Sequence, residues 1–282
     1  MSAILAPLAA AVLAAHSPCP AGDPLPHPLP PPDTSLSMVL NIPAFRLDVR
    51  NGEGIVRSYT VAVGSRRYRT PTGQFGVSSV ELNPWWHPPD SPWARDEKVT
   101  PPGPDNPMGP AKLNFHELYF LHGTPWERSL GSAASHGCVR MAPRDVRELA
   151  RMVLAATRPD VSAAEVDAAE ADPRRTRRYA LRRPVPLQVR YQTAEVRGDT
   201  LELHPDVYGR ERTTLRARAL EALRQAGVVY ELIDTAKLDS LVRAGRRGHA
   251  RLALEELLVS PAALPVPDVP ASPVPLPERR RR

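Results

Sequence analysis

Apolar and polar side chains alternate from Met38 to Gly64. The apolar positions are Leu40, Ile42, Phe45, Leu47, Val49, Ile55, Tyr59, Val61 and Val63. Because successive side chains of a β-strand point to opposite faces of a sheet, this period of two predicts strands with one buried face. Gly52 and Gly54 lie in the middle of the run and predict the turn of a β-hairpin.

The period changes after Met141. Pro143 suits the first turn of a helix, and Asp145 suits its positive end. One apolar stripe at helical spacing follows, formed by Val146, Leu149, Ala150 and Val153. Ser162 and Glu165 resemble a capping box that opens a second, short helix. We therefore predict a mainly β domain with a helix directly after residue 141.

Proline marks the ends of the folded part. Much of the chain's Pro lies over residues 21–32 and 261–277, where we expect extended, poorly packed backbone. We predict four segments. The first is a signal-like apolar segment and Pro-rich linker over 1–35, and the second is the main domain over 36–184. The third is a C-terminal extension over 185–259, with strands and then helices from residue 213, and the fourth is a Pro-rich tail with a basic end over 260–282.

The run from Ile4 to Ala15 is too short to span a bilayer but has the length of a signal-peptide core. It lacks the positive charges that usually precede such a core, and an Ala-rich buried helix is the alternative interpretation. The Pro-rich tract after it favours export, to the periplasm or the cell wall. We expect no disulfide between Cys19 and Cys138, because Cys138 is a candidate nucleophile and must then be a free thiol.

The sequence offers little support for a nucleic-acid partner, and we expect none. The chain has 37 basic and 31 acidic residues, which is a mild excess. The sequence contains no zinc-finger spacing, aromatic RNA-binding signature or helix-turn-helix pattern.

The strongest chemical signal is the stretch from Ser135 to Met141, which reads Ser-His-Gly-Cys-Val-Arg-Met. Cys138 is one of two cysteines, and His122 lies upstream of it in Leu-His-Gly-Thr. A thiol reacts as the thiolate, and a nearby imidazole can lower the thiol pKa and shuttle its proton. We therefore expect His122 and Cys138 to titrate as a coupled pair, so that the rate of acylation rises with a macroscopic pKa below the value of about 8.5 of a free thiol.

Alternation along an extended segment would place His136, Cys138 and Arg140 on one face. Gly137 leaves the space between them open for a substrate backbone. The amides of Gly137 and Cys138 could then donate to the oxyanion that forms when a carbonyl is attacked. The planar guanidinium of Arg140 suits a peptide carboxylate or a nearby carbonyl.

Other interpretations stay open on spacing alone. A lone Cys is usually a small buried hydrophobe, and a lone His is usually a satisfied polar group. Cys138, His122 and His136 could also be three zinc ligands, with His116 as a fourth. Spacing does not decide between these roles.

Several ordered strings resemble the signature of the L,D-transpeptidases, the YkuD-type cysteine enzymes of bacterial cell walls. They are Thr-Pro-Thr-Gly-Gln-Phe at 70–75, Trp-His-Pro-Pro at 86–89, Asn-Pro-Met-Gly at 106–109, Leu-His-Gly-Thr at 121–124 and the stretch from Ser135 to Met141. Met108 stands where the family has Leu. The resemblance covers about residues 40–153, and residues 185–209 resemble a continuation found in longer members.

The resemblance implies that Cys138 is the nucleophile and His122 the base. It places Gly123 where the family offers a backbone carbonyl, or a small side chain, to orient that base. The supporting residues around the site are Ser135, His136, Gly137 and Arg140. The implied fold is a sandwich of two mixed sheets with a helix after the catalytic segment.

The implied reaction is acyl transfer on peptidoglycan donor and acceptor stem peptides. Cys138 would attack the carbonyl of the third stem residue and expel the terminal D-alanine, and an acceptor amine would then form a 3→3 crosslink. The family needs no metal or organic cofactor, carbapenems are expected to acylate the same cysteine, and we expect a monomer.

Two other function classes remain. An L,D-carboxypeptidase would use the same residues with water as the acceptor, whereas a noncatalytic or zinc-binding wall-associated module would not need the thiol as a nucleophile. We interpret Trp85, Trp86 and Trp93 as core residues rather than as a cover for the donor peptide.

Overall fold

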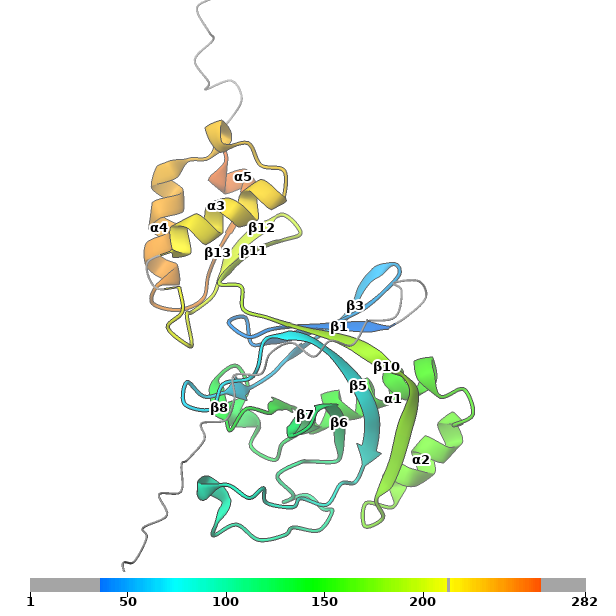
Figure 1. Cartoon of the computed structure of the whole chain (residues 1–282). Coiled ribbons are helices and arrows are strands. Elements are labelled where there is room, and N and C mark those ends of the chain that lie inside the picture. The colour runs from blue at the N-terminus through cyan, green and yellow to red at the C-terminus, as the bar shows by residue number, and fades with distance from the viewer. Residues whose placement is uncertain (1–35, 212–213, 260–282) are drawn as a thin grey trace, which may run out of the picture. The chain divides into compact units, whose positions relative to one another are not determined.

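The computed structural model describes residues 36–211 and 214–259 (Figure 1). The chain forms two compact units that meet in sequence between Tyr191 and Gln192. The signal-like segment over 1–35, which includes Cys19, and the tail over 260–282 lie outside the described residues. In the described ranges, no helix has both the length and the apolar character that crossing a membrane requires.

The alternating run after Met38 forms three antiparallel strands, which confirms the predicted hairpin. They are β1 (Ser37–Asn41), β2 (Arg46–Asn51) and β3 (Gly54–Thr60). Leu40 pairs with Leu47, and Leu47 pairs with Tyr59, so that buried apolar side chains follow one another across the strands. Gly54 has a φ of 132° at the turn, a value that favours glycine.

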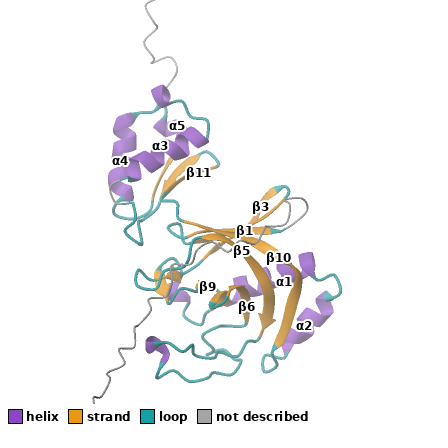
Figure 2. Ribbon diagram, viewed as in Figure 1, coloured by secondary structure: helices purple, strands orange, loops and turns teal. Residues whose placement is uncertain are grey.

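These strands belong to a mixed sheet of eight, in the order β3-β2-β1-β10-β5-β6-β7-β9. The other five strands are β5 (Gly73–Leu82), β6 (Ala111–His116), β7 (Tyr119–Gly123), β9 (Val139–Met141) and β10 (Arg177–Arg190). Two pairs are parallel, β1 with β10 and β7 with β9. A second, two-stranded parallel sheet joins β4 (Val63–Gly64) to β8 (Ala133–Ser135). The mainly β class with mixed sheets is confirmed (Figure 2).

Because of strand β10, the main domain ends later in the sequence than predicted. The boundary predicted between residues 184 and 185 falls inside this strand, and the first unit instead ends at Tyr191. Beyond that point Leu187 pairs with Met38 of β1 and with Phe75 of β5. The register shifts between Ala180 and Val185, and this irregularity accommodates Pro184, which has no backbone N–H to donate.

The helix predicted after residue 141 is α1 (Pro143–Thr157). Asp145 lies in its first turn, and its buried face packs on β6, β7 and β10. The second helix is α2 (Ala163–Ala171), where the Ser162 side chain accepts a hydrogen bond from the Glu165 amide. Short 3-10 turns lie at Pro92–Ala94 and Glu127–Ser129.

The second unit is a three-stranded antiparallel sheet with helices (Figure 2). Its strands are β11 (Ala194–Arg197), β12 (Thr200–Leu203) and β13 (Ala250–Ala253), and its helices are α3 (Leu215–Gln225), α4 (Thr235–Gly245) and α5 (Leu254–Leu257), with a 3-10 turn at Tyr230–Leu232. Leu201, Leu203, Leu223 and Leu238 are fully buried in its core. The helical reading from residue 213 missed β13, because pairing with β12 overrides the helix propensity of its Ala and Leu residues.

Leu187→Ala should destabilise the first unit by about 2–5 kcal/mol, because this fully buried side chain would leave a cavity between its neighbours. Gln188→Ala is the matched control, since Gln188 is the next residue and is exposed. All 4 tryptophans of the chain lie in the first unit, so their fluorescence during urea unfolding reports on it. Equal, small effects of both changes would contradict a strand that continues past residue 184.

Candidate active site

Residues 136–138 form a turn between β8 and β9. Gly137 has a φ of 116°, and a Cβ there would lie 2.8 Å from the Tyr119 ring. The prediction of one extended segment with His136, Cys138 and Arg140 on the same face is therefore wrong, because the backbone at Gly137 interrupts the alternation. Glycine is required here both by the backbone angle and by the close approach of Tyr119.

Two hydroxyl groups hold this turn. Ser135 Oγ donates to the Cys138 carbonyl at 2.5 Å and accepts from the Gly137 amide at 3.0 Å. Thr70 Oγ1 donates to the Gly137 carbonyl at 2.8 Å and accepts from the Gly64 amide, also at 2.8 Å. Thr70 is buried and was not predicted as a site residue, although it opens the string at 70–75. Ser135 and Thr70 thus fix the backbone on both sides of the sulfur.

Of the two backbone amides predicted to donate to an oxyanion, only one has a free N–H in the part of the chain that the structure describes. The Gly137 amide is already bonded to Ser135 Oγ. The Cys138 amide makes no hydrogen bond to any residue of the described ranges. Of these two amides, the one open to a new acceptor is therefore that of Cys138.

The sulfur of Cys138 lies against the beginning of β7. Its thiol is 3.5 Å from the Leu118 carbonyl oxygen, to which it donates, and the backbone of Phe120 also hydrogen-bonds to it. Phe120 and His122 are two residues apart on β7 and therefore share a face of the strand. β7 therefore supplies both the backbone that contacts the sulfur and, two residues after Phe120, the imidazole of His122.

His122 is buried and its orientation is fixed by backbone. Nδ1 lies 2.6 Å from the carbonyl oxygen of Gly123. Because a carbonyl oxygen only accepts, the proton is on Nδ1 and the lone pair is on Nε2. A Cβ at Gly123 would come within 2.7 Å of Pro110, so only glycine allows the loop before β6 to pack here.

A row of charged residues crosses the strands at this point. Lys112 on β6 is the register partner of His122 on β7, which is the register partner of Arg140 on β9. Glu81 on β5 pairs with Lys112 and forms an ion pair with it, with an N···O distance of 3.3 Å. Lys112 was not predicted as a site residue, because its position opposite His122 depends on the register of β6 and β7, which the sequence pattern does not reveal.

Burial has the largest effect on the protonation of both reactive groups. It lowers the pKa of His122 to about 4 and raises the pKa of Cys138 to about 11. Arg140 and Lys112 also lower the pKa of His122, whereas they favour the Cys138 thiolate and partly oppose the effect of burial on its pKa. The pKa of the Cys138 thiol thus lies above the value of about 8.5 of an ordinary thiol, and the pH dependence expected for acylation stays a prediction. At neutral pH the site holds a neutral thiol beside a neutral imidazole, which is the form that can accept a proton.

Aromatic rings flank the remaining motif residues. His136 stacks on Trp93 with ring centroids 3.9 Å apart and an interplanar angle of 5°, and Tyr68 lies 4.7 Å from the same ring. The guanidinium carbon of Arg140 lies 5.5 Å from the centroid of Trp126. These contacts hold His136 and Arg140 beside the turn that carries the sulfur.

The interpretation of three tryptophans as core residues is wrong. Trp85 is 43 % exposed, and Trp86 and Trp93 are partly exposed. All three lie in the long connection between β5 and β6, outside the sheet.

The four residues considered as zinc ligands are not gathered at one point. His116 stacks on Tyr119 with ring centroids 5.6 Å apart, while His136 lies between Trp93 and Tyr68. In residues 36–211 and 214–259, the metal-ligating side chains that do cluster belong to the second unit. The geometry therefore does not support a zinc site at Cys138.

A separate pocket of about 360 Å³ lies elsewhere in the first unit. Its lining residues are Asn83, Gly103, Pro104, Gly109, Pro110, Pro125, Pro143, Arg147 and Pro173. None of the predicted site residues lines it, so the chemistry points to the region of Cys138 and His122 instead.

The comparisons with known proteins agree on one family. The family model of the YkuD L,D-transpeptidase catalytic domain matches residues 37–166. A Bacillus licheniformis protein named as the L,D-transpeptidase YkuD is 31% identical over 135 residues, which make up 46% of this chain and 68% of that protein. The chain belongs to the L,D-transpeptidase family.

Other members overlap with this L,D-transpeptidase family chain only in part. YqjB of Bacillus subtilis, also named as an L,D-transpeptidase, is 32% identical over 106 residues, or 36% of this chain and 56% of YqjB. The chain thus spans little more than half the length of that relative. A solved L,D-transpeptidase from Mycobacterium smegmatis aligns with 55% of this chain and 58% of its own, at 16% identity and a TM-score of 0.38.

The family match covers every predicted site residue and ends at residue 166. The second unit, which begins at Gln192, lies outside the match.

Alkylation of Cys138 by iodoacetamide should accelerate steadily with pH. In the Cys19→Ala protein the rate should rise about tenfold per pH unit from about pH 7 to about pH 9.5 without a plateau, because a raised thiol pKa leaves little thiolate at neutral pH. A model peptide thiol, with a pKa of about 8.5, should level off within this range and serves as the control. A plateau below about pH 8.5 in the protein would contradict the neutral thiol.

Lys112→Met should slow that alkylation about two- to tenfold at about pH 9, because it removes a cation that favours the thiolate and keeps an apolar stem of similar length. Lys98→Met is the matched control, since Lys98 is exposed. Circular dichroism would confirm that both variants fold. An unchanged or faster rate in Lys112→Met would exclude this electrostatic role.

Proposed function

We propose that the protein is an L,D-transpeptidase that acts on peptidoglycan stem peptides through a thioester on Cys138. The observation that carries the proposal is the neutral thiol held at the beginning of β7, the strand that carries a buried imidazole whose Nδ1 is hydrogen-bonded to the Gly123 carbonyl. This arrangement leaves Nε2 as a base for the thiol. Family membership supports a peptidoglycan substrate.

The first half of the reaction forms the acyl-enzyme. Nε2 of His122 takes the thiol proton as Cys138 Sγ attacks the amide carbonyl of the third stem residue, and a C–S bond forms. The C–N bond then breaks, and the imidazolium returns the proton to the leaving amine of the terminal D-alanine. The Cys138 amide donates to the oxyanion in between.

The second half transfers the acyl group. The side-chain amine of an acceptor stem peptide attacks the thioester carbonyl, His122 takes a proton from this amine, and the C–S bond breaks. The proton returns to Cys138, and the product is a 3→3 crosslink. Water in place of the amine would give carboxypeptidase activity.

The surrounding charges suit this path. Lys112 and Arg140 favour the thiolate while it exists, and the low polarity that keeps the resting thiol neutral strengthens their effect. Arg140 also offers a planar fork for the carboxylate of the donor peptide. The wall of Trp93, His136 and Tyr68 can flank the peptide backbone.

Two further parts of the proposal follow from this chemistry. A carbapenem would acylate Cys138 once, because its strained lactam carbonyl can take the place of the stem-peptide amide. The substrate lies in the periplasm or cell wall, so the protein would be exported, with the apolar run in residues 1–35 as the signal.

Incubation with a disaccharide tetrapeptide, followed by mass spectrometry, tests the reaction. The native chain should release D-alanine and form a crosslinked dimer, and Cys138→Ala should lower turnover by at least ~1000-fold with an unchanged melting temperature. Cys19→Ala is the matched control and should be fully active.

Each alternative outcome has a distinct reading. If a tripeptide monomer is the only product, the protein is an L,D-carboxypeptidase and not a transpeptidase. Full turnover in folded Cys138→Ala, or a carbapenem adduct at another residue, would overturn the thioester mechanism.

A further inference from the structure

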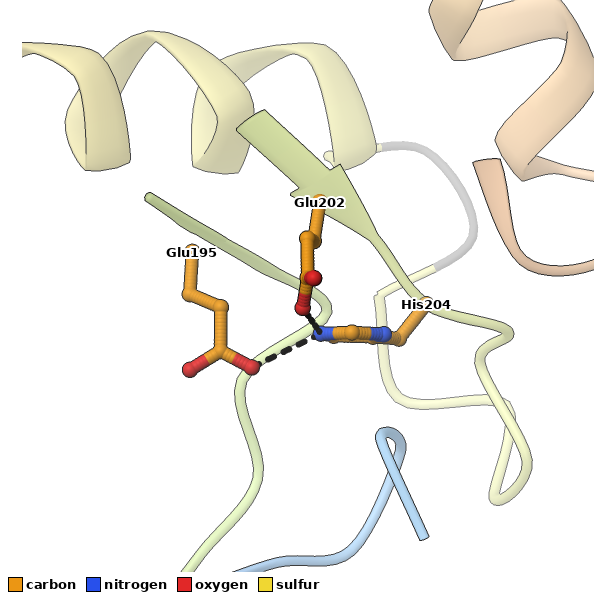
Figure 3. Close-up of side chains that lie close together, drawn as sticks. All are labelled: Glu195, Glu202 and His204. Atoms are coloured by element: carbon orange, nitrogen blue, oxygen red, sulfur yellow. Dashed lines mark hydrogen bonds and ion pairs between the residues drawn. The ribbon is translucent and has the colours of Figure 1, made fainter. Parts of the chain in front are cut away.

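Three potential metal ligands meet on the sheet of the second unit. Glu195 on β11 and Glu202 on β12 are register partners, and His204 follows directly after β12 (Figure 3). Their neighbours Leu201 and Leu203 are buried in the core of this unit. Because side chains alternate along a strand, Glu202 and His204 point away from that core.

The carboxylates converge on one nitrogen of the histidine. Glu195 Oε1 lies 2.8 Å from His204 Nε2, and Glu202 Oε2 lies 4.0 Å from the same atom. The three ligand atoms all lie within 4.8 Å of one another. Glu195 and His204 are buried and Glu202 is half-buried, so this is not a loose group of surface acids.

These separations are close to those of a metal site. Zinc binds imidazole nitrogen and carboxylate oxygen at about 2.0–2.2 Å, which in tetrahedral geometry puts neighbouring ligands roughly 3.3–3.6 Å apart. The two distances from His204 Nε2 fall on either side of this range. Small rotations of the two Glu side chains would therefore centre an ion between the three atoms.

A second histidine orients the first. His204 Nδ1 lies 3.2 Å from Nδ1 of His249, which precedes β13. Ligating histidines usually donate their other ring N–H to a neighbouring acceptor. Without an ion, the Nε2–H of His204 donates to Glu195 Oε1, because a carboxylate oxygen only accepts. A divalent ion would displace this proton and bind the lone pair of Nε2, while Nδ1 keeps His249 as its hydrogen-bond partner.

We propose that Glu195, Glu202 and His204 bind one divalent transition-metal ion of the class of Zn²⁺. The ion clamps β11 to β12 and offsets the repulsion of two carboxylates that lie directly opposite each other in a sheet. The other charged neighbour in this row is Arg251 on β13, the register partner of Glu202, and its side chain is exposed. An imidazole ligand favours this class over Mg²⁺ and Ca²⁺, which prefer oxygen.

Equilibrium dialysis of the full-length, tag-free chain against Zn²⁺ tests the site. The Cys19→Ala/Cys138→Ser background removes both thiols as competing ligands. This protein should bind one Zn²⁺ per chain at about pH 7.5, and about 1 mM Mg²⁺ should not displace it. Glu202→Gln and His204→Gln should each raise the dissociation constant at least ~10-fold.

The controls match the two residue types. Glu231→Gln and His87→Gln change exposed residues and should bind Zn²⁺ like the parent. Zinc should also raise the melting temperature of the parent by about 3 °C or more, a measurement that needs no variant. No bound zinc, no shift in melting temperature, displacement by Mg²⁺ or equal binding by the Glu202 and His204 variants would each overturn the proposal.

Discussion

The parallel pairing of β7 with β9 is the interaction on which the site depends. It sets His122 beside Arg140 and lets the sulfur of Cys138 reach back to the Leu118 carbonyl at the start of β7. Parallel neighbours cannot be joined by a tight turn, so the chain leaves the sheet after Gly123 and returns through β8. β8 pairs with β4, which anchors the returning chain just before the catalytic turn. The sheet thus determines where the candidate residues His122 and Cys138 lie along β7 and β9.

The same sheet decides the electrostatics of the site. Burial keeps both His122 and Cys138 neutral, although Lys112 and Arg140 favour the thiolate. A neutral pair avoids the cost of holding two isolated charges away from water. In the proposed reaction, the cations would act on the negative charge that the sulfur gains when it loses its proton, since the resting thiol carries none.

Local sequence patterns predicted the parts of the fold that depend on local rules. The alternation after Met38, the Pro143 helix start and the Ser162 cap are all confirmed, because each rests on backbone geometry over a few residues. The end of the first unit at Tyr191 and strand β13 were not predicted, since both depend on pairing with strands far away in the sequence. The positions of Lys112 and Thr70 beside the reactive groups were missed for the same reason.

The protonated thiol of Cys138 has a consequence for the lifetime of the protein. Oxidation by peroxides proceeds through the thiolate and begins the path to sulfenic and then irreversible sulfinic and sulfonic acids. A thiol whose pKa is raised to about 11 exposes very little thiolate at neutral pH. The proton on the sulfur therefore protects it from adventitious oxidants at neutral pH.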